Sequence, residues 1–353
     1  MEFLTTKFDD GALLFALALL VGVLFGAAAQ HSRFCLRSAT IEFSSGSWGK
    51  GLSIWLVAFL AAVACVQLLI SRGYLDVSQA RQLAATGSLS GAIIGGLMFG
   101  VGMILARGCA SRLLILSATG NLRALVTGLV LTLTAQASLR GGLSPAREAL
   151  SELWTVSGGE GRNLLTYFQL NASAMAVFAL AGLALAVWFA HSSGTKHSRI
   201  FAAIIVGLAV GLGWLGTYQV AQASFEIVPI SSVTFTGPSA DTLMGLVNSR
   251  SLPLSFGSGL VPGVFIGAMA MAAVSGEAKI QRFEPDTPME RYLLGGVLMG
   301  FGSMLAGGCA VGAGMSGGAI FAMTAWVALT AMWVGASITN LMMNMPSRHA
   351  VQA

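Results

Sequence analysis

Long, nearly uncharged apolar runs alternate along the chain with short polar segments. Each run holds roughly 17–25 residues, the length of helix that crosses the hydrocarbon core of a bilayer. The pattern predicts nine membrane-spanning helices, near residues 11–29, 51–71, 88–106, 122–138, 165–190, 199–217, 256–275, 290–306 and 319–342.

Two segments between the predicted spans have a distinct character. Residues 139–164 form the longest polar stretch, and Ser144-Pro145 within it is a favourable helix start with proline at the first helical position. Because the apolar residues that follow share one face, we expect a short amphipathic helix on the membrane surface. Residues 218–255 contain three prolines, so we expect an irregular segment that partly folds back into the bundle.

The composition agrees with a bundle embedded in lipid. Hydrophobic residues make up 55% of the chain and charged residues 9%, against about 25% charged residues in a typical soluble domain. The formal net charge is +5, but the 19 Lys and Arg are scattered through short loops without a basic tail or stripe. The positive charge therefore indicates a membrane orientation rather than a nucleic-acid partner.

The distribution of basic residues predicts that orientation. With the N-terminus outside, twelve of the 19 Lys and Arg fall in the inside loops and seven in the outside loops. Cytoplasmic loops carry the excess of Lys and Arg in membrane proteins. We therefore expect the N-terminus outside and the C-terminus in the cytoplasm.

One glycine-rich segment occurs twice. Residues Gly95–Ala110 read GGLMFGVGMILARGCA, and Gly295–Ala310 read GGVLMGFGSMLAGGCA, with nine of sixteen positions identical and no gap. A cysteine matched within ungapped glycine spacing indicates an internal duplication. We divide the chain into two halves, residues 1–190 and 191–353, within one integral membrane domain.

The number of spans between the two copies predicts their relative orientation. Five predicted spans separate Cys109 from Cys309, and because five is odd the two loops enter from opposite faces. Inverted repeats are typical of transporters that bind substrate near the midplane, where broken helices meet. The sequence therefore favours transport over a purely structural role.

The sequence around the two cysteines suggests what these loops do. Gly108 and Gly308 permit irregular backbone, which membrane proteins tolerate at depth where it lines a cavity. Short helices that start there would direct their positive N-terminal ends at an anion. The alternative for each cysteine is a small, inert residue that packs two helices. The match between Cys109 and Cys309 favours a functional pair.

The other two cysteines carry weaker signals. Cys35 follows the first span, where the residues alone equally allow an ordinary loop with basic anchors or a third re-entrant loop. Cys65 lies within an apolar run and is predicted to serve packing. No Cys-x-x-Cys pair is present, and the four His lie near loops or termini, so we expect neither a metal site nor a cofactor.

Three signatures give the chain a resemblance to the YeeE/YedE family of bacterial inner-membrane sulfur transporters. They are Gln30-x-x-Arg33-Phe34-Cys35-Leu36, the segment ending in Gly108-Cys109-Ala110, and the segment ending in Gly307-Gly308-Cys309. The resemblance implies an all-α, hourglass-shaped protein of about nine spans plus short re-entrant helices, with an inverted repeat. It also implies that thiosulfate passes by hydrogen bonds to the thiols of Cys35, Cys109 and Cys309. A small cytoplasmic sulfurtransferase often collects the product in this family.

The chain departs from the family pattern at one place. Arg107 and Arg112 flank Cys109, where the family usually has Ala-Gly-Gly-Cys followed by small residues. These two arginines belong, with Gln30 and Arg33, to the expected substrate path, and they would either bind an anion or lie at its exit. They leave the substrate open among thiosulfate, a related sulfur oxyanion and a selenium analogue.

Two alternatives to a permease remain at this point. A thiol is a weak hydrogen-bond donor, so a permease would hold the terminal sulfur of thiosulfate briefly, without redox change. A membrane thiol–disulfide oxidoreductase would instead cycle Cys109 and Cys309 through a disulfide. A structural or regulatory protein would not move any anion.

Overall fold

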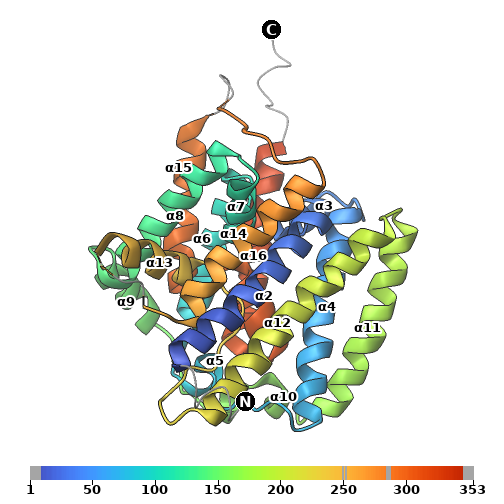
Figure 1. The fold of residues 1–353 in the computed structure, drawn as a ribbon, viewed down its shortest axis with the longest axis vertical. Helices are drawn as coiled ribbons and strands as arrows, with labels where there is room; N and C mark the ends of the chain where they lie inside the picture. The colour runs from blue at the N-terminus through green and yellow to red at the C-terminus, as the bar shows by residue number, and fades with distance from the viewer. Residues whose placement is uncertain (1–8, 249, 251–252, 284–287, 345–353) are drawn as a thin grey trace.

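The computed structural model describes residues 9–248, 250, 253–283 and 288–344, and this part of the chain is mostly helical, with almost no sheet (Figure 1). Nine helical segments within it are long and apolar enough to cross a membrane, which confirms the predicted number of spans and the all-α polytopic class. The long helices are α2 (Asp10–Ser32), α4 (Lys50–Ser71), α6 (Leu89–Leu105), α8 (Leu122–Arg140), α11 (Ala172–Ser192), α12 (His197–Ala223), α14 (Phe256–Val274), α15 (Met289–Leu305) and α16 (Met323–Asn344).

Short elements connect the long helices. Helices α3 (Leu36–Ser44), α7 (Ala110–Ala118) and η2 (Ala310–Gly317) follow α2, α6 and α15 after breaks of a few residues. Helix α13 (Thr236–Asn248) precedes α14. The remaining elements are α5 (Arg81–Ala84), α9 (Ser144–Glu152), η1 (Glu160–Arg162), α10 (Leu164–Tyr167) and the strands β1 (Gly87–Ser88) and β2 (Thr155–Val156), which pair antiparallel.

Two spans begin later than the apolar pattern predicts. The span expected at 165–190 begins as α11 at Ala172, after a turn in which Gln169 has a φ of 53°. The span expected at 319–342 begins as α16 at Met323, after a turn in which Phe321 has a φ of 55°. The residues before each turn are largely apolar and continue the hydrophobic run, so hydropathy does not mark the start of the helix.

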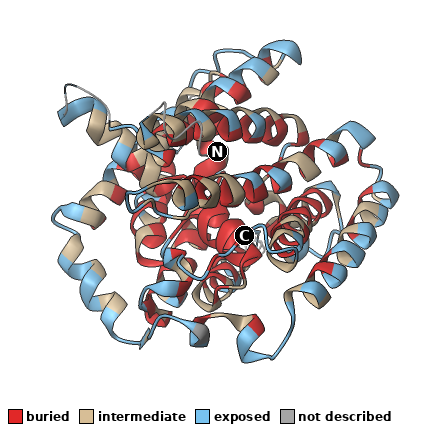
Figure 2. Cartoon of the chain, turned by 60° about the horizontal axis from the view of Figure 1, so that its bottom comes forward, coloured by how far each residue is buried: buried red, intermediate tan, exposed pale blue. Residues whose placement is uncertain are grey.

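Helix α11 lies at the edge of the bundle, where it packs on α4 (Figures 1 and 2). Only 17% of its most apolar window is buried in the protein, against 67% for α4. Phe178, Leu185 and Trp188 are all exposed on it. In a membrane protein such apolar side chains face lipid, so α11 forms an outer wall and α4 belongs to the core.

Helices α6 and α15, which carry the two copies of the glycine-rich segment, cross with their backbones in contact. A Cβ atom added to Gly102 would lie 2.6 Å from the carbonyl oxygen of Gly295, and one added to Gly302 would lie 2.7 Å from that of Gly95. The early residues of one helix thus meet the late residues of the other, so the helices run antiparallel. Only glycine permits this approach, as in other tightly packed membrane helices.

The contacts of these two helices with their neighbours are also paired. Gly100 of α6 lies against Met332 and Ala336 of α16, while Gly300 of α15 lies against Leu131 and Ala135 of α8. The sequence offset is 200 residues for the glycines and 201 for the partners, so corresponding residues make corresponding contacts. Helices α2 and α12 follow the same rule, because α2 packs on α14 and α12 packs on α4.

The two polar segments fold largely as expected. Helix α9 begins at Ser144 with proline in its first turn, which confirms the predicted short helix, while its position on the membrane surface stays a prediction. After α12, the chain returns into the bundle as an extended segment in which the Ser232 hydroxyl donates to the Val210 carbonyl oxygen at 2.6 Å. Val233 and Phe235 are buried there, which confirms the predicted fold-back.

Candidate functional site

Cys35, Cys109 and Cys309 occupy the same structural position. Each is the residue that precedes a short helix, α3, α7 or η2, and each has extended backbone geometry. The thiols therefore lie beside the first backbone N–H groups of their helices, where the helix dipole is positive. The structure thus gives Cys35 the same setting as the two cysteines of the repeated segment, which the sequence alone did not establish.

The break before each cysteine is built in the same way. Two residues upstream, Arg33, Arg107 and Gly307 have left-handed φ values of 59°, 55° and 80°. The following N–H group closes the long helix by donating to a carbonyl oxygen five residues earlier, at 3.1 Å for Phe34, 3.2 Å for Gly108 and 2.8 Å for Gly308. This is the hydrogen bond of a helix C-terminal motif. The motif ends the long helix, and the chain changes direction before the cysteine that starts the short helix.

The left-handed residue predicts a measurable cost of substitution. We expect Gly307→Ala to lower the free energy of unfolding by about 1 kcal/mol, because a Cβ atom at positive φ meets the following carbonyl group. A Cβ atom at Gly307 has no other atom within 4 Å, so the effect isolates the backbone. Gly237→Ala is the control, since Gly237 also faces open space but lacks a positive φ. Thermal unfolding in detergent would contradict the expectation if both variants melted like the parent.

The thiols of Cys35 and Cys109 form a close pair. They lie within hydrogen-bonding reach of each other, and the sulfur of Cys109 is 3.3 Å from the hydroxyl oxygen of Ser111. Cys109 is 1% exposed, Cys35 is partly buried, and both are free thiols. Two thiols and a hydroxyl thus converge at the start of α7.

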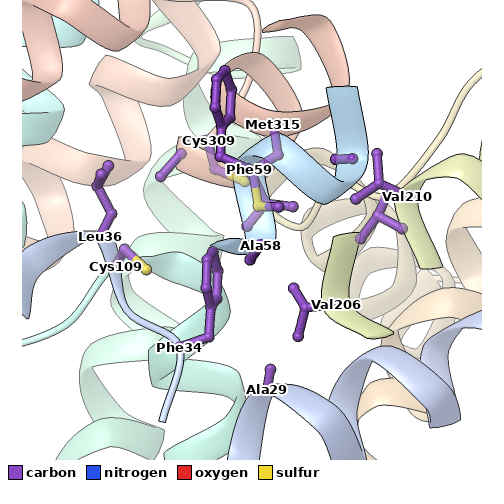
Figure 3. Close-up of a cluster of buried hydrophobic side chains, with 14 of the residues drawn as sticks. Ala29, Phe34, Leu36, Ala58, Phe59, Cys109, Val206, Val210, Cys309 and Met315 are labelled. Atoms are coloured by element: carbon purple, nitrogen blue, oxygen red, sulfur yellow. The ribbon is translucent and has the colours of Figure 1, made fainter. Parts of the chain in front are cut away.

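Cys309 lies at the start of η2, deep in the same buried cluster. Its sulfur accepts from the backbone N–H of Gly312 at 3.4 Å, and the side chain is 1% exposed. Helix η2 is held by the Ser316 hydroxyl, which donates to the Val233 carbonyl oxygen at 2.6 Å. Figure 3 shows Cys109 and Cys309 within one cluster of buried side chains that includes Phe34. Since η2 also contacts α7, the two helices that begin at these cysteines meet inside the protein.

A fourth short helix has the same place in the second half but carries no thiol. Helix α13 follows Phe235, whose backbone carbonyl oxygen accepts from the Ser239 N–H at 2.8 Å. The ring of Phe235 is buried and packs on Phe25, with centroids 5.2 Å apart. The residue before the short helix is therefore Cys35 in the first half and an aromatic residue in the second.

A polar pocket of about 400 Å³ lies beside the Cys35–Cys109 pair, at the ends of α2, α7 and α14. Three of the sequence-predicted path residues are in its wall: Gln30, Arg33 and Arg112. The Gln30 side chain is buried and accepts from Arg112 Nη1 at 3.3 Å. Its amide nitrogen donates to Glu277 Oε2 at 2.8 Å, and Arg33 Nη2 donates to Glu277 Oε1 at 3.0 Å.

Glu277 is the pocket residue that sequence reasoning missed. It lies in the α14–α15 loop, 242 residues beyond Cys35, and no local motif marks it. The hydrogen bond from Arg33 lowers the pKa of its carboxyl group, assisted by the hydrogen bond from Gln30. The carboxylate is therefore ionised at neutral pH. The partly exposed Glu277 carboxylate accepts from two donors and brings a negative charge to an otherwise basic pocket.

Arg107 does not join this pocket. Its side chain is exposed, and its guanidinium lies 5.9 Å from the centroid of the Tyr292 ring, over which Arg123 also lies at 4.6 Å. Of the two arginines that flank Cys109, only Arg112 is therefore placed beside the thiol pair. Within the described ranges, no three His, Cys, Asp or Glu side chains gather as ligands for a metal ion.

Comparisons with known proteins agree on one family. The model of a family described as Sulphur transport matches residues 31–338. The thiosulfate transporter TsuA of Escherichia coli strain K12 is 26% identical over 343 residues, covering 90% of this chain and 91% of that protein. The thiosulfate transporter TsuA of Spirochaeta thermophila is 29% identical over 328 residues, covering 88% of this chain and 93% of that protein.

Proposed function

Because the chain belongs to the sulphur-transport family, as a multi-pass membrane transporter of a sulfur-containing anion, we propose that its substrate is thiosulfate. The observation that carries this proposal is the matched position of Cys35, Cys109 and Cys309 before three short helices. The thiols would line the path, with the breaks at Gly108 and Gly308 placing two of them. The relatives are named as transporters, which points to transport rather than catalysis.

The chemistry of the three thiols suits this substrate. Thiosulfate has a soft terminal sulfur and a sulfonate-like end, and a neutral S–H group is a weak donor that can bind either and release it. The N-terminal ends of α3, α7 and η2 add partial positive charge without a fixed counter-ion. Weak donors and partial charges favour passage over tight retention.

An inverted repeat of residues 1–190 and 191–353 is the arrangement that the helix contacts support. The antiparallel contact of α6 with α15 pairs Gly95 with Gly302 and Gly102 with Gly295. These are exchanged copies of one contact, as a two-fold axis lying in the membrane plane would produce. The axis would bring the Cys109 and Cys309 loops into an hourglass-shaped protein from opposite faces.

The proposed orientation follows from the basic residues. Arg33, Arg112 and Lys279 lie together at the ends of α2, α7 and α14. The excess of Lys and Arg on the cytoplasmic side of membrane proteins would put this end in the cytoplasm and the N-terminus outside. The proposed location is the bacterial inner membrane, in keeping with the bacterial relatives, and a small sulfurtransferase would collect the anion at this same end.

Uptake into proteoliposomes tests the proposed substrate. The purified protein should accumulate radiolabelled thiosulfate well above protein-free vesicles, with sulfate, sulfite and selenium analogues as competitors. If unlabelled thiosulfate inhibits uptake at a lower concentration than any other competitor, thiosulfate is the preferred anion. Uptake equal to that of empty vesicles would contradict the proposal. Preferential uptake of sulfate would show that sulfate, and not thiosulfate, is the substrate.

The closeness of Cys35 and Cys109 is the one observation that favours a thiol–disulfide oxidoreductase. The disulfide would then form between these two cysteines, and not between Cys109 and Cys309. A permease should keep its thiols reduced during turnover. Rapid alkylation followed by mass spectrometry during thiosulfate uptake should therefore label all four cysteines. A disulfide that accumulates in proportion to substrate turnover would support redox chemistry instead.

A further inference from the structure

The pocket beside the thiol pair has the charge of an anion site. Its wall combines three cationic side chains, Arg33, Arg112 and Lys279, with one carboxylate, Glu277. The local formal charge is therefore +2 when Glu277 occupies the pocket. We refer to this cavity, lined by Gln30, Arg33, Arg112, Leu116, Thr119, Gly276, Glu277, Lys279 and Gln281, as the Glu277 pocket.

Arg112 lacks a carboxylate of its own. It makes no ion pair with any carboxylate in the described part of the chain, and its side chain donates to the neutral amide of Gln30. Its charge interacts with Cys35 and Cys109 and also with Glu277, which shares the pocket wall with it. A largely buried cation is costly to leave without an anion. Arg112 is thus placed to receive an anion that leaves the thiol pair.

Glu277 already occupies the anion position. Its two carboxylate oxygens accept from Gln30 and Arg33 at 2.8 and 3.0 Å, which is how an incoming oxyanion would be held. The preceding residue, Gly276, has a φ of 69° and no side chain to restrict the loop. Glu277 is partly exposed, so its carboxylate can leave the pocket for water without unfolding its surroundings.

We propose that the Glu277 pocket is a second substrate site, specific for a doubly charged sulfur oxyanion, in which the Glu277 carboxylate is an internal competitor. The inference rests on the proposed function, because it assumes that the anion reaches the pocket from Cys35 and Cys109. Arrival of the dianion displaces Glu277 from Gln30 and Arg33. Return of the carboxylate expels the dianion, so that Glu277 speeds release from a site that is otherwise strongly basic.

Glu277→Gln tests the competitor directly. We expect about tenfold tighter binding of thiosulfate in detergent, because one elementary negative charge is removed from within a few ångströms of the site. KM and kcat for uptake into proteoliposomes should both fall, since release becomes slow. Arg112→Gln should weaken binding by a similar factor. A role for Glu277 in folding alone would not produce tighter binding together with slower turnover.

The controls separate the possible failures. Glu148→Gln removes the carboxylate of the other ion pair, Arg147–Glu148 at 2.8 Å, and should change neither constant. Glu277→Asp has a shorter side chain and should give a smaller shift in the same direction. Unchanged binding and turnover in Glu277→Gln would overturn the competitor, as would loss of folded protein in both Glu277 variants. If the parent protein itself fails to take up thiosulfate, the proposed function is wrong, whereas tighter thiosulfate binding by Glu277→Gln in detergent would still establish the pocket.

Discussion

Replacing Cys109 by alanine is expected to reduce thiosulfate uptake by about 10- to 100-fold. The Cys109 side chain, at 1% exposed, is the more enclosed member of the Cys35–Cys109 pair. Leaving a buried substrate atom without its donor costs about 1–3 kcal/mol in binding or in the barrier to passage. Loss of the contact with Cys35 adds to this cost. Initial rates of radiolabelled uptake in proteoliposomes provide the measurement.

Cys65→Ala is the matched control for this experiment. Cys65 is also a free cysteine on a membrane helix, α4, but its sulfur packs against Gly211 of α12. Its loss should leave uptake unchanged, while Cys309→Ala should reduce uptake as Cys109→Ala does. Growth on thiosulfate of a strain that lacks other uptake routes gives an independent measurement. Normal uptake by both the Cys109 and the Cys309 variant would refute a path lined by these thiols.

Substituting Gly102 by valine is expected to prevent stable assembly of the bundle. Even the Cβ atom of the new side chain would lie 2.6 Å from the Gly295 carbonyl oxygen and 2.9 Å from the Met299 backbone nitrogen. Both are backbone atoms of α15, so no side chain can rotate away. Forcing the helices apart costs about 3 kcal/mol or more, a large part of the stability of a typical protein. Yield and thermal unfolding in detergent measure the effect.

Gly128 provides a control in another membrane helix. A Cβ atom there meets only the Leu113 side chain, at 3.9 Å, so Gly128→Ala should leave the unfolding temperature close to that of the parent. Gly102→Ala should fall between the control and the valine variant. A Gly102→Val protein that unfolds at the parental temperature would show that α6 and α15 are not packed as described.

Hydropathy was sufficient to predict the long helices, because each must span the same thickness of hydrocarbon. It could not place the starts of α11 and α16, since the turns at Gln169 and Phe321 lie in apolar sequence. The repeated segment marked α6 and α15 as corresponding helices, and the odd number of spans between the copies predicted opposite directions, but neither predicted that the two helices cross in contact. Glycines that allow close approach are common in membrane helices, so the glycine pattern alone does not identify the partner of each helix.

The candidate site was only partly predictable. Cys109 and Cys309 were marked by the repeat, whereas Cys35 needed either the family resemblance or its structural position before α3. The sequence provides no reason to prefer Arg107 or Arg112 as the substrate-path residue. In the structure only Arg112 lines the polar pocket, whereas Arg107 lies over Tyr292. Glu277 reaches that pocket from a distant loop, which no local pattern can reveal.

The glycine-packed contacts between the halves restrict the motions by which transport can occur. Gly22 of α2 lies against Leu260 and Val264 of α14, in addition to the crossing of α6 with α15. In these contacts the backbones touch directly, with few side chains between them that could rearrange. A rigid-body rotation of one half against the other would therefore break all of these contacts at once. We therefore expect the frame to stay fixed during a transport cycle, with movement confined to α3, α7, η2 and the loop of Glu277. Cross-linking α6 to α15 at the membrane surface should then leave uptake intact. A transporter whose two halves rotate against each other would instead lose uptake.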